Sequence, residues 1–525
     1  MKVNFGSQMM HVARRFADRE ALVNIERGRR YSFMEFHLLT NRIANMLMAR
    51  FGLRRGDKYL NILENDNISL VHLPTIFKGE ATCAWTNYRD SMDEHLWQID
   101  WAQPKVVLLE LPLVDDYYDP LRERGIEIVC MDPPPEEREG VHYFWDLLEN
   151  ASDSETGVEH DRYRDVVLFR FTGGTTGKGK CAMYTFQNWE TNRILGLTLP
   201  ERYCYPETRF IHLGPMSHAS GLFVLAPLFM GSCQQTQNLP DLEQFCANIE
   251  AEKVTSTLLV PTVLYRLLEL EETGKYDLSS LDAVLYGAAP MNPDKLRQLQ
   301  ARFGNIFVQV YGSTEHPAVT TALLKADHIV EKEEDAGRLA SCGKVTPGVE
   351  MKIADEEGNE VAAGEVGEIW HRSPAVIPGY YNNPEATEAE IVDGWWKSGD
   401  MGTMDEKGYV YIVDRKKDMI ITGGFNVYAI EVENALCSHP AVSMAAVVGI
   451  PHPDWGEAVH AEVVLRQGAI PDTSDMIDHV KAEIGRYKAP KSIIFVDALP
   501  MSVVGKVLRR KVREKYWKGE QRKVS

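Results

Sequence analysis

The sequence predicts an α/β protein: a large N-terminal domain of α/β subdomains that includes a β-rich region, and a small α+β C-terminal domain. The chain has 525 residues, which is too long for one hydrophobic core. Strand-like and helix-like stretches alternate as far as Tyr311, as they do in parallel α/β sheets. After Glu350, short strand-like segments with glycine turns indicate an antiparallel region, and the last stretch has its own helices and strands. We therefore expect one domain over residues 1–413 and another over residues 414–525.

The first elements expected along the chain are two amphipathic helices within residues 8–50, on either side of a short hairpin. This hairpin covers residues 21–32 and turns around Gly28. Strand signals then alternate with helical stretches, at residues 59–63, 106–109 and 126–130. The longest apolar stretch, residues 222–230, contains Pro227 and is much shorter than the roughly 18 residues of a membrane span, so we expect it to be a buried element.

Composition and charge exclude several classes of function. A formal net charge of −19 argues against sequence-independent binding of nucleic acid, which needs a basic surface. The eight cysteines show no C-x-x-C pair and no histidine at metal-ligand spacing, so we expect reduced, packed thiols in a cytoplasmic protein. Residues 1–20 carry charges where a signal peptide has an apolar stretch. We expect no membrane span and no nucleic-acid partner.

Residues 166–184, VVLFRFTGGTTGKGKCAMY, predict a strand, a phosphate-binding loop and a second strand. Glycines let the backbone aim consecutive N–H groups at an anion, while threonine hydroxyls add donors and lysines add positive charge. The candidate phosphate-binding residues are Thr172, Gly173, Gly174, Thr175, Thr176, Gly177 and Lys180.

A second interpretation of this loop is a Walker A motif. From Gly174 the letters GTTGKGKC nearly match that motif, but Cys181 stands where a Walker loop has the Ser or Thr that holds Mg²⁺. Residues 182–186 also favour a strand over the helix that follows a Walker loop. A P-loop kinase or ATPase is therefore the remote alternative.

Residues 171–181, FTGGTTGKGKC, resemble the phosphate loop of adenylate-forming enzymes, [FY]-T-S-G-T-T-G-x-P-K-G, with departures at Gly173, Gly179 and Cys181. Further motifs follow in the order of that superfamily: PMSHASG at 215–221, YGAAPM at 286–291, YGSTE at 311–315, GYYNNPEAT at 379–387, the stretch from Trp395 with WWKSGD and DRKKD, and GKVLRRK at 505–511. With these seven motifs the chain resembles acyl-CoA synthetases, adenylation domains and luciferases over nearly its whole length. It is most similar to an AMP-forming acyl- or aryl-CoA ligase.

This resemblance implies a two-step reaction with ATP, Mg²⁺ and CoA. A fatty or aromatic carboxylic acid would react with ATP to give an acyl adenylate and pyrophosphate, and the acyl group would then pass to the CoA thiol. A free carboxylate is a poor electrophile because its negative charge repels nucleophiles. The first step develops charge on phosphoryl oxygens, so catalysis depends mainly on positioning and electrostatic stabilisation.

The resemblance also implies roles for residues that would bind Mg²⁺ and ATP. Glu315 would bind Mg²⁺ with help from Thr172, and Thr314 would contact the α-phosphate. Asp400 would accept hydrogen bonds from the ribose hydroxyls, with Arg415 beside it. The adenine pocket would be formed by the ring of Tyr311 and by the residues Gly287, Ala288, Ala289 and Gly312.

The C-terminal domain of the family is mobile, and the resemblance places three residues in its movement. Lys506 would bridge the carboxylate and the α-phosphate during adenylate formation. Lys417 occupies the hinge position of the family. After rotation the segment around Gly424 would replace Lys506, and a glycine there would let the pantetheine arm of CoA pass close to the backbone.

His218 would lie at the mouth of the acid pocket and gate it or orient the substrate. Members that activate α-amino acids usually carry Asp at the next position, where this chain has Ala219, so an uncharged acyl or aryl acid is expected. Apolar lining of the pocket would come from Phe223, Val260, Leu285 and Met291.

Other members of the superfamily leave alternatives open. A stand-alone adenylation enzyme that loads a carrier protein has similar motifs, and so does a luciferase-like oxygenase. The expected partners are therefore an acid, ATP and CoA, with a carrier protein and a homodimer as open possibilities.

Overall fold

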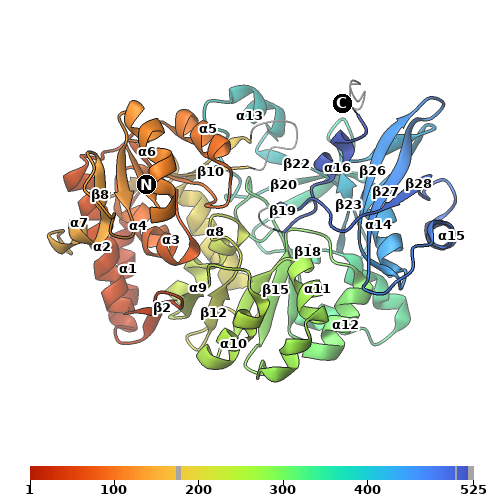
Figure 1. Ribbon diagram of the computed structural model, residues 1–525, viewed down its shortest axis with the longest axis horizontal. Helices are drawn as coiled ribbons and strands as arrows, with labels where there is room; N and C mark the ends of the chain where they lie inside the picture. The colour runs from red at the N-terminus through yellow and green to blue at the C-terminus, as the bar shows by residue number, and fades with distance from the viewer. Residues whose placement is uncertain (173–178, 503–504, 518–525) are drawn as a thin grey trace.

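The computed structural model describes residues 1–172, 179–502 and 505–517, which form four large sheets with helices packed around them (Figure 1). A short antiparallel pair, β1 (Lys2–Val3) with β9 (His160–Asp161), adds to these sheets. None of the helices in these residues is long and apolar enough to cross a membrane. All eight cysteines are free thiols and seven of them are buried, as the sequence predicts.

The first sheet has seven strands and lies in the N-terminal part of the chain. In spatial order its strands are β11 (Cys181–Thr185), β10 (Val166–Phe171), β5 (Thr82–Trp85), β4 (Lys58–Ile62), β6 (Val106–Leu109), β7 (Glu127–Cys130) and β8 (Val141–Tyr143). All neighbours are parallel except β10 and β11, which pair antiparallel. The two predicted strands are confirmed as β10 and β11, with one correction: Phe186 is not in the second strand, because it begins helix α8.

Helices cover both faces of this sheet. They are α1 (Phe5–Arg15), α2 (Phe33–Arg50), α3 (Asn65–Val71), α4 (Leu73–Lys78), α5 (Met92–Ala102), α6 (Val114–Glu123) and α7 (Phe144–Glu149). Helix α2 begins where Ser32 and Glu35 form a capping box, which satisfies free N–H groups of the first turn.

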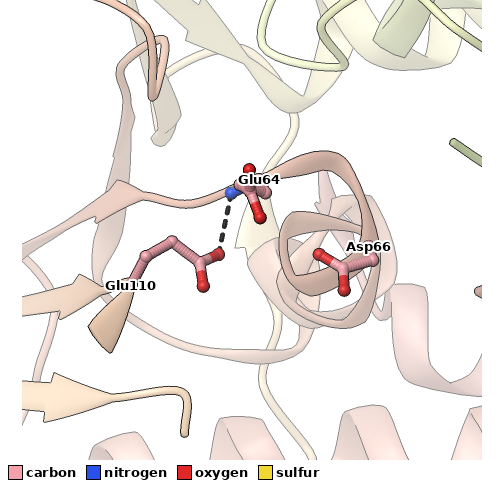
Figure 2. Close-up of side chains that lie close together, drawn as sticks. All are labelled: Glu64, Asp66 and Glu110. Atoms are coloured by element: carbon pink, nitrogen blue, oxygen red, sulfur yellow. Dashed lines mark hydrogen bonds between the residues drawn. The ribbon is translucent and has the colours of Figure 1, made fainter. Parts of the chain in front are cut away.

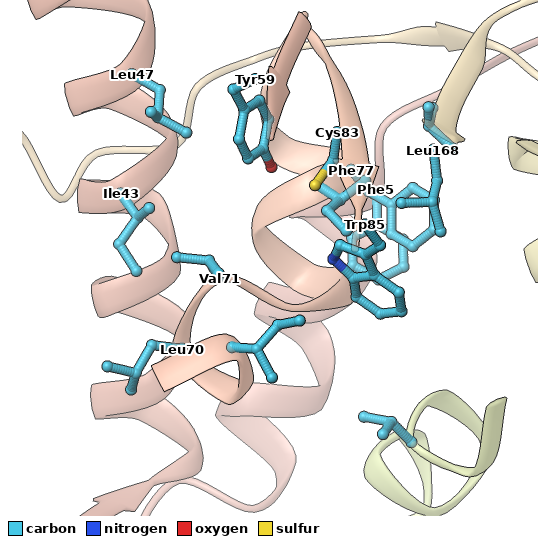
Figure 3. Close-up of a cluster of buried hydrophobic side chains, with 14 of the residues drawn as sticks. Phe5, Ile43, Leu47, Tyr59, Leu70, Val71, Phe77, Cys83, Trp85 and Leu168 are labelled. Carbon is cyan, nitrogen blue, oxygen red and sulfur yellow. The ribbon is translucent and has the colours of Figure 1, made fainter. Parts of the chain in front are cut away.

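The main core lies between this sheet and its helices (Figure 3). Ile43 and Leu47 of α2 face Tyr59 of β4, and Trp85 of β5 packs near Leu168 of β10. Burial of each such side chain contributes roughly 1.5–3 kcal/mol, so this core fixes the helices to the strands that lead into the phosphate loop.

The second sheet has nine strands. In spatial order they are β18 (Lys344–Val345), β17 (Thr321–Leu323), β16 (Phe307–Tyr311), β15 (Ala283–Gly287), β14 (Ser256–Leu259), β12 (Arg209–His212), β13 (Cys233–Thr236), β2 (Glu20–Asn24) and β3 (Arg29–Ser32). Its central strands are parallel, and the predicted hairpin of β2 and β3 forms one edge. The helices around it are α8 (Phe186–Thr198), α9 (Leu225–Phe229), α10 (Leu242–Glu252), α11 (Pro261–Glu269) and α12 (Pro293–Phe303).

The third sheet is the antiparallel region that the sequence predicts after Glu350. Its strands are β19 (Glu350–Ala354), β20 (Gly367–Arg372), β22 (Trp395–Met404), β21 (Ile391–Val392) and β23 (Val410–Arg415), with helix α13 (Pro384–Glu390) beside them. Strand β23 ends two residues beyond the expected domain boundary, and the next strand belongs to another sheet.

The fourth sheet belongs to the C-terminal part of the chain, at the right of Figure 1. It contains β25 (Phe425–Val427), β24 (Ile420–Thr422), β27 (Gly456–Leu465), β26 (Val442–His452) and β28 (Ser492–Phe495). The helices of this part are α14 (Ala429–Ser438), α15 (Thr473–Ile484) and α16 (Arg509–Glu514). This sheet has a hydrophobic core of its own.

Candidate active site

Three expected nucleotide-binding residues come together from two sheets. The Tyr311 hydroxyl, at the end of β16, donates a hydrogen bond of 2.7 Å to Oδ2 of Asp400 in β22. Nε of Arg415 lies 3.2 Å from Oδ1 of the same carboxylate. Asp400 and Arg415 are direct neighbours in the register of β22 and β23, so pairing of these strands places the guanidinium beside the carboxylate.

The backbone after β15 is held very close to β16. A Cβ at Gly287 would lie 2.1 Å from the carbonyl oxygen of Val310, so only glycine fits there. Ala288 follows with φ of 64°, which is uncommon for a residue with a side chain and costs free energy. At Gly312 a Cβ would lie 2.5 Å from the carbonyl oxygen of Ala318. These close approaches fix the path of the segment expected to line the adenine pocket.

Thr172 and Lys180 close the base of the predicted phosphate loop. The Thr172 N–H donates to the Lys180 carbonyl oxygen at 2.8 Å, and the Lys180 N–H donates to Thr172 Oγ1 at 3.0 Å. The expected loop residues Gly173, Gly174, Thr175, Thr176 and Gly177 lie outside the described residues.

The Lys180 ammonium takes part in a network that the sequence analysis missed. Its Nζ lies 2.6 Å from Oε1 of Glu390 in α13 and 3.1 Å from the Tyr380 hydroxyl. That hydroxyl also contacts Glu390 Oε2 at 2.5 Å and Glu315 Oε1 at 3.0 Å. Tyr380 belongs to the GYYNNPEAT motif, which signals the segment, but nothing in the sequence brings Glu390 to Lys180.

Thr314 and Glu315 lie in the turn after β16. The Thr314 carbonyl accepts a hydrogen bond of 2.6 Å from the Tyr184 hydroxyl in β11, which ties this turn to the first sheet. Burial is the largest cause that raises the pKa of Glu315, and Glu390 adds to it, whereas Lys180 opposes it. A carboxylate in such surroundings gains from a nearby cation.

His218 follows β12 in the segment 215–221. Its Nε2 lies 3.2 Å from Nδ2 of Asn87, a residue that the sequence analysis did not single out. Ala219 begins the short 3-10 helix η2 (Ala219–Phe223). The expected apolar lining does not form one cluster. Phe223 and Leu285 are buried together, whereas Met291 packs in a different part of the core.

Lys506 reaches this site from the C-terminal segment. The Gly505 carbonyl accepts a hydrogen bond of 2.7 Å from Thr262 Oγ1 in α11, which anchors the segment on the second sheet's helices. Burial and the Arg415 guanidinium lower the pKa of the half-buried Lys506 to about 8, while Asp400 raises it. The positive charge of Lys506 also lowers the pKa of His218. The structure therefore gathers Lys506, Asp400 and Arg415, with His218 near enough to be affected.

The remaining C-terminal residues are placed differently. Burial, the largest cause, and the charges of Arg415 and Lys180 lower the pKa of Lys417 to about 8, so its ammonium lies within electrostatic reach of the site. Gly424 is exposed in the turn between β24 and β25, with φ of 84°, and a Cβ at this position would have no atom within 4 Å. The structure thus brings Lys506 and Lys417, and not Gly424, to the nucleotide-binding residues.

Arg509 fixes the Lys506 segment to the start of the C-terminal part. Its Nε donates to Glu433 Oε1 at 2.7 Å, and its Nη1 donates to Asp414 Oδ1 at 3.2 Å. Burial raises the pKa of Asp414 to about 6 even though Arg509 opposes the change. This buried ion pair links β23, α14 and α16.

An acidic cluster lies elsewhere, where Glu64, Asp66 and Glu110 approach one another (Figure 2). Carboxylate oxygens of this cluster already have hydrogen-bond partners in the protein: Glu110 accepts from the Glu64 N–H at 2.8 Å and from Asn67 Nδ2. Arg27 Nε lies 2.5 Å from Asp66 Oδ2. These contacts describe a structural network, and we assign no metal to it.

Comparison with known proteins gives the family. The pattern described as AMP-binding enzyme matches residues 9–381, and that described as AMP-binding enzyme C-terminal domain matches residues 431–506. A medium/long-chain-fatty-acid–CoA ligase of Mycobacterium tuberculosis is 41% identical over 366 residues, which cover 68% of this chain and 63% of that protein, less than two thirds of it. 4-coumarate–CoA ligase 1 of Petroselinum crispum is 30% identical over 511 residues, covering 96% of this chain and 92% of that protein.

Solved structures agree with this assignment. ATP-bound MatB from Rhodopseudomonas palustris is 28% identical with a TM-score of 0.86, and the match covers 98% of this chain and 99% of that one. An o-succinylbenzoate CoA synthetase from Bacillus subtilis, in complex with its acyl-adenylate intermediate, is 26% identical with a TM-score of 0.82, over 98% of each chain. The chain therefore belongs to the family of AMP-binding enzymes, among the AMP-forming acid:CoA ligases.

Proposed function

We propose that this protein joins a fatty or aromatic carboxylic acid to CoA, through an acyl adenylate that forms from ATP with release of pyrophosphate. The observation that carries the proposal is the position of Lys506. A lysine from the far end of the chain lies within electrostatic reach of Asp400 and Arg415, where it can neutralise charge that develops between a carboxylate and the α-phosphate.

Mg²⁺ fits the residues that the resemblance assigns to it. Glu315 and Thr172 offer carboxylate and hydroxyl oxygens, which are ligands that a hard cation prefers. Two carboxylates, Glu315 and Glu390, contact the one Tyr380 hydroxyl, so a divalent cation would relieve their repulsion. When bound, Mg²⁺ would neutralise phosphate charge. Lys180 would contact the β- and γ-phosphates, in competition with Glu390.

The nucleoside would lie against Tyr311 and the 287–289 backbone. Because the Tyr311 hydroxyl donates to Asp400 Oδ2, it fixes that carboxylate beside the ring. Arg415 holds the other oxygen. Asp400 would then accept hydrogen bonds from the ribose hydroxyls, while Thr314 contacts the α-phosphate and the Tyr311 ring stacks on adenine.

For the second step we propose rotation of the C-terminal domain, residues 414–525, about Lys417. Gly424 is exposed in a turn of that domain, so rotation can carry it toward the acyl group and remove Lys506. A glycine there leaves room for the pantetheine arm of CoA.

We propose an uncharged acid as the substrate. Ala219 offers no partner for an ammonium group next to His218. Relatives include ligases named for medium/long-chain fatty acids and for 4-coumarate. Buried free thiols fit a reducing compartment, and we place the reaction in the cytoplasm.

The test is pyrophosphate release with MgATP over a panel of aliphatic, aryl and amino acids, with and without CoA. We expect turnover with apolar acids that increases with CoA. Lys506→Ala should lower adenylate formation roughly 10²–10³-fold, as loss of an electrostatic stabiliser does, yet retain thioester formation from pre-made adenylate. Phosphate release in place of pyrophosphate, or equal loss of both half-reactions in the variant, would contradict the proposal.

A further inference from the structure

Below His218 lies a buried arginine that the sequence analysis did not single out. Arg170 in β10 is 4% exposed, and its Nε donates to the Ser217 carbonyl oxygen at 3.0 Å. Its Nη2 donates to the same oxygen. The guanidinium lies 5.6 Å from the ring centre of Trp85 and 6.0 Å from that of Tyr184. Arg170 therefore holds the carbonyl that immediately precedes His218.

This cation has no counter-ion in the part of the chain that the structure describes: no carboxylate there lies within 4 Å of its guanidinium. A buried charge without a partner destabilises a fold, and burial lowers the pKa of Arg170. An apolar side chain would pack between Trp85 and Tyr184 at lower cost. We therefore expect the charge of Arg170 to have a role at the segment that it contacts, which contains Ser217 and His218.

Asn87 fixes which nitrogen of His218 carries the proton. Its Oδ1 accepts from the Arg89 N–H at 3.1 Å, so its amide orientation is set and Nδ2 is the atom that faces the imidazole. An amide N–H₂ can only donate, so Nε2 of His218 must accept with a lone pair. The neutral ring then carries its proton on Nδ1.

Two cations on different elements act against a second proton on this ring. Burial is the largest cause that lowers the pKa of His218. Arg170 from β10 and Lys506 from the C-terminal segment lower it further, and together the three causes bring it to about 3. No carboxylate of residues 1–172, 179–502 or 505–517 forms an ion pair with His218 that would oppose them. His218 is thus neutral across the physiological range.

We propose that Arg170 and Asn87 are positioning residues that hold His218 as the neutral Nδ1–H tautomer, so that His218 donates a hydrogen bond to the substrate and does not act as a base. The direction of that bond, toward the carboxylate or the acyl adenylate, rests on the proposed function. The tautomer itself does not, because it follows from the contacts of Asn87 with His218 and with the Arg89 N–H, while Arg170 holds the neighbouring Ser217 carbonyl.

The test is ¹⁵N NMR of the full chain with labelled histidine, in which the spectrum of His218→Gln identifies the His218 signals among those of the 15 histidines. In the wild type we expect a protonated Nδ1 and an unprotonated Nε2 that do not change between pH 6 and pH 9. Asn87→Asp should move the proton to Nε2 and raise the pKa, because a carboxylate accepts where the amide donates.

Arg170→Met should raise the pKa of His218 from about 3 by at least about one unit, which is a tenfold change in proton affinity. The titrations of the wild type and the variants therefore extend from pH 6 down to pH 4. Arg193→Met is the matched control, since Arg193 also stacks on an aromatic ring, 4.2 Å from the Phe229 centre, away from His218. An Nε2–H signal in the wild type, or a His218 titration unchanged in both Arg170→Met and Asn87→Asp, would overturn the proposal. If the tautomer is as expected but no acid is activated, the proposed function fails alone.

Discussion

Lys506 lies in surroundings that weaken its hold on a proton. Burial and Arg415 lower its pKa to about 8, well below the ordinary value for lysine, and Asp400 only partly opposes them. Only the ammonium form can bridge two anions, so the active form is present below about pH 8 and is lost as the pH rises through this value.

We therefore expect kcat/KM for adenylate formation to fall above about pH 8, because this parameter reports groups of the free enzyme. The measurement is pyrophosphate exchange between pH 6.5 and 9.5 with a saturating acid. Lys506→Arg should give a lower but flat profile, since guanidinium stays charged. Lys417 has a similar pKa, so Lys417→Arg serves as the control and should retain the alkaline fall. A wild-type profile that is flat to pH 9.5 would show that another group controls this step.

The ion pair of Lys180 and Glu390 predicts a competition with ATP. Both side chains are about one third exposed, so the pair is worth at most about 1 kcal/mol. Glu390→Gln removes the competing anion, and we expect KM for ATP to fall roughly two- to fivefold with kcat little changed. Glu388→Gln, on the exposed side of the same helix, is the matched control and should leave KM unchanged. A raised KM for ATP in Glu390→Gln would indicate instead that Glu390 helps to hold the metal.

At the level of elements, the junction of β15 and β16 depends on one glycine. A Cβ at Gly287 would clash with the Val310 carbonyl oxygen. This oxygen belongs to the backbone, so it cannot rotate away as a side chain can. The same junction carries Ala288 in a left-handed conformation, so local strain is already present where the adenine pocket is expected.

Gly287→Ala should therefore destabilise the protein by about 1–3 kcal/mol, the usual range for an overpacked core, and raise KM for ATP. Urea unfolding followed by tryptophan fluorescence gives the first quantity, and pyrophosphate exchange gives the second. Gly274→Ala is the control, because a Cβ at that position would have no atom within 4 Å and the φ of Gly274 is not positive. Equal midpoints for the two variants would mean that the backbone at Gly287 relaxes freely.

For the whole molecule, the central prediction is the proposed rotation of the C-terminal domain. Proline at position 417 fixes φ, so Lys417→Pro should keep adenylate formation and remove CoA ligation by at least tenfold. The structure adds a necessary control. Because the charge of Lys417 interacts with those of Asp400 and Lys180, proline also deletes a charge near the site, and Lys417→Ala separates the two effects. Full CoA ligation in Lys417→Pro, or equal loss in Lys417→Ala, would argue against the hinge.

The sequence alone determined the α/β architecture, the antiparallel region, the two strands β10 and β11 on either side of the predicted phosphate loop, and the family. These features come from patterns that are visible in the sequence itself, namely the alternation of strands and helices, the glycine turns and the order of the motifs. The resemblance to the family also predicts roles for Glu315, Asp400 and Lys506. The end of β11 was misjudged because Thr185 and Asn188 form a capping box that starts α8 at Phe186.

Only the tertiary structure decided which groups surround those residues. Glu390 meets Lys180, Asn87 meets His218, and Arg170 holds Ser217, although these partners are separated by many residues in the chain. Nothing local distinguishes them, since a glutamate on a short helix or an arginine in a strand has no pattern of its own. Their partners follow from the packing of the first sheet against the second and third sheets. The partners of these active-site groups are therefore set by contacts across sheets, which the order of residues does not reveal.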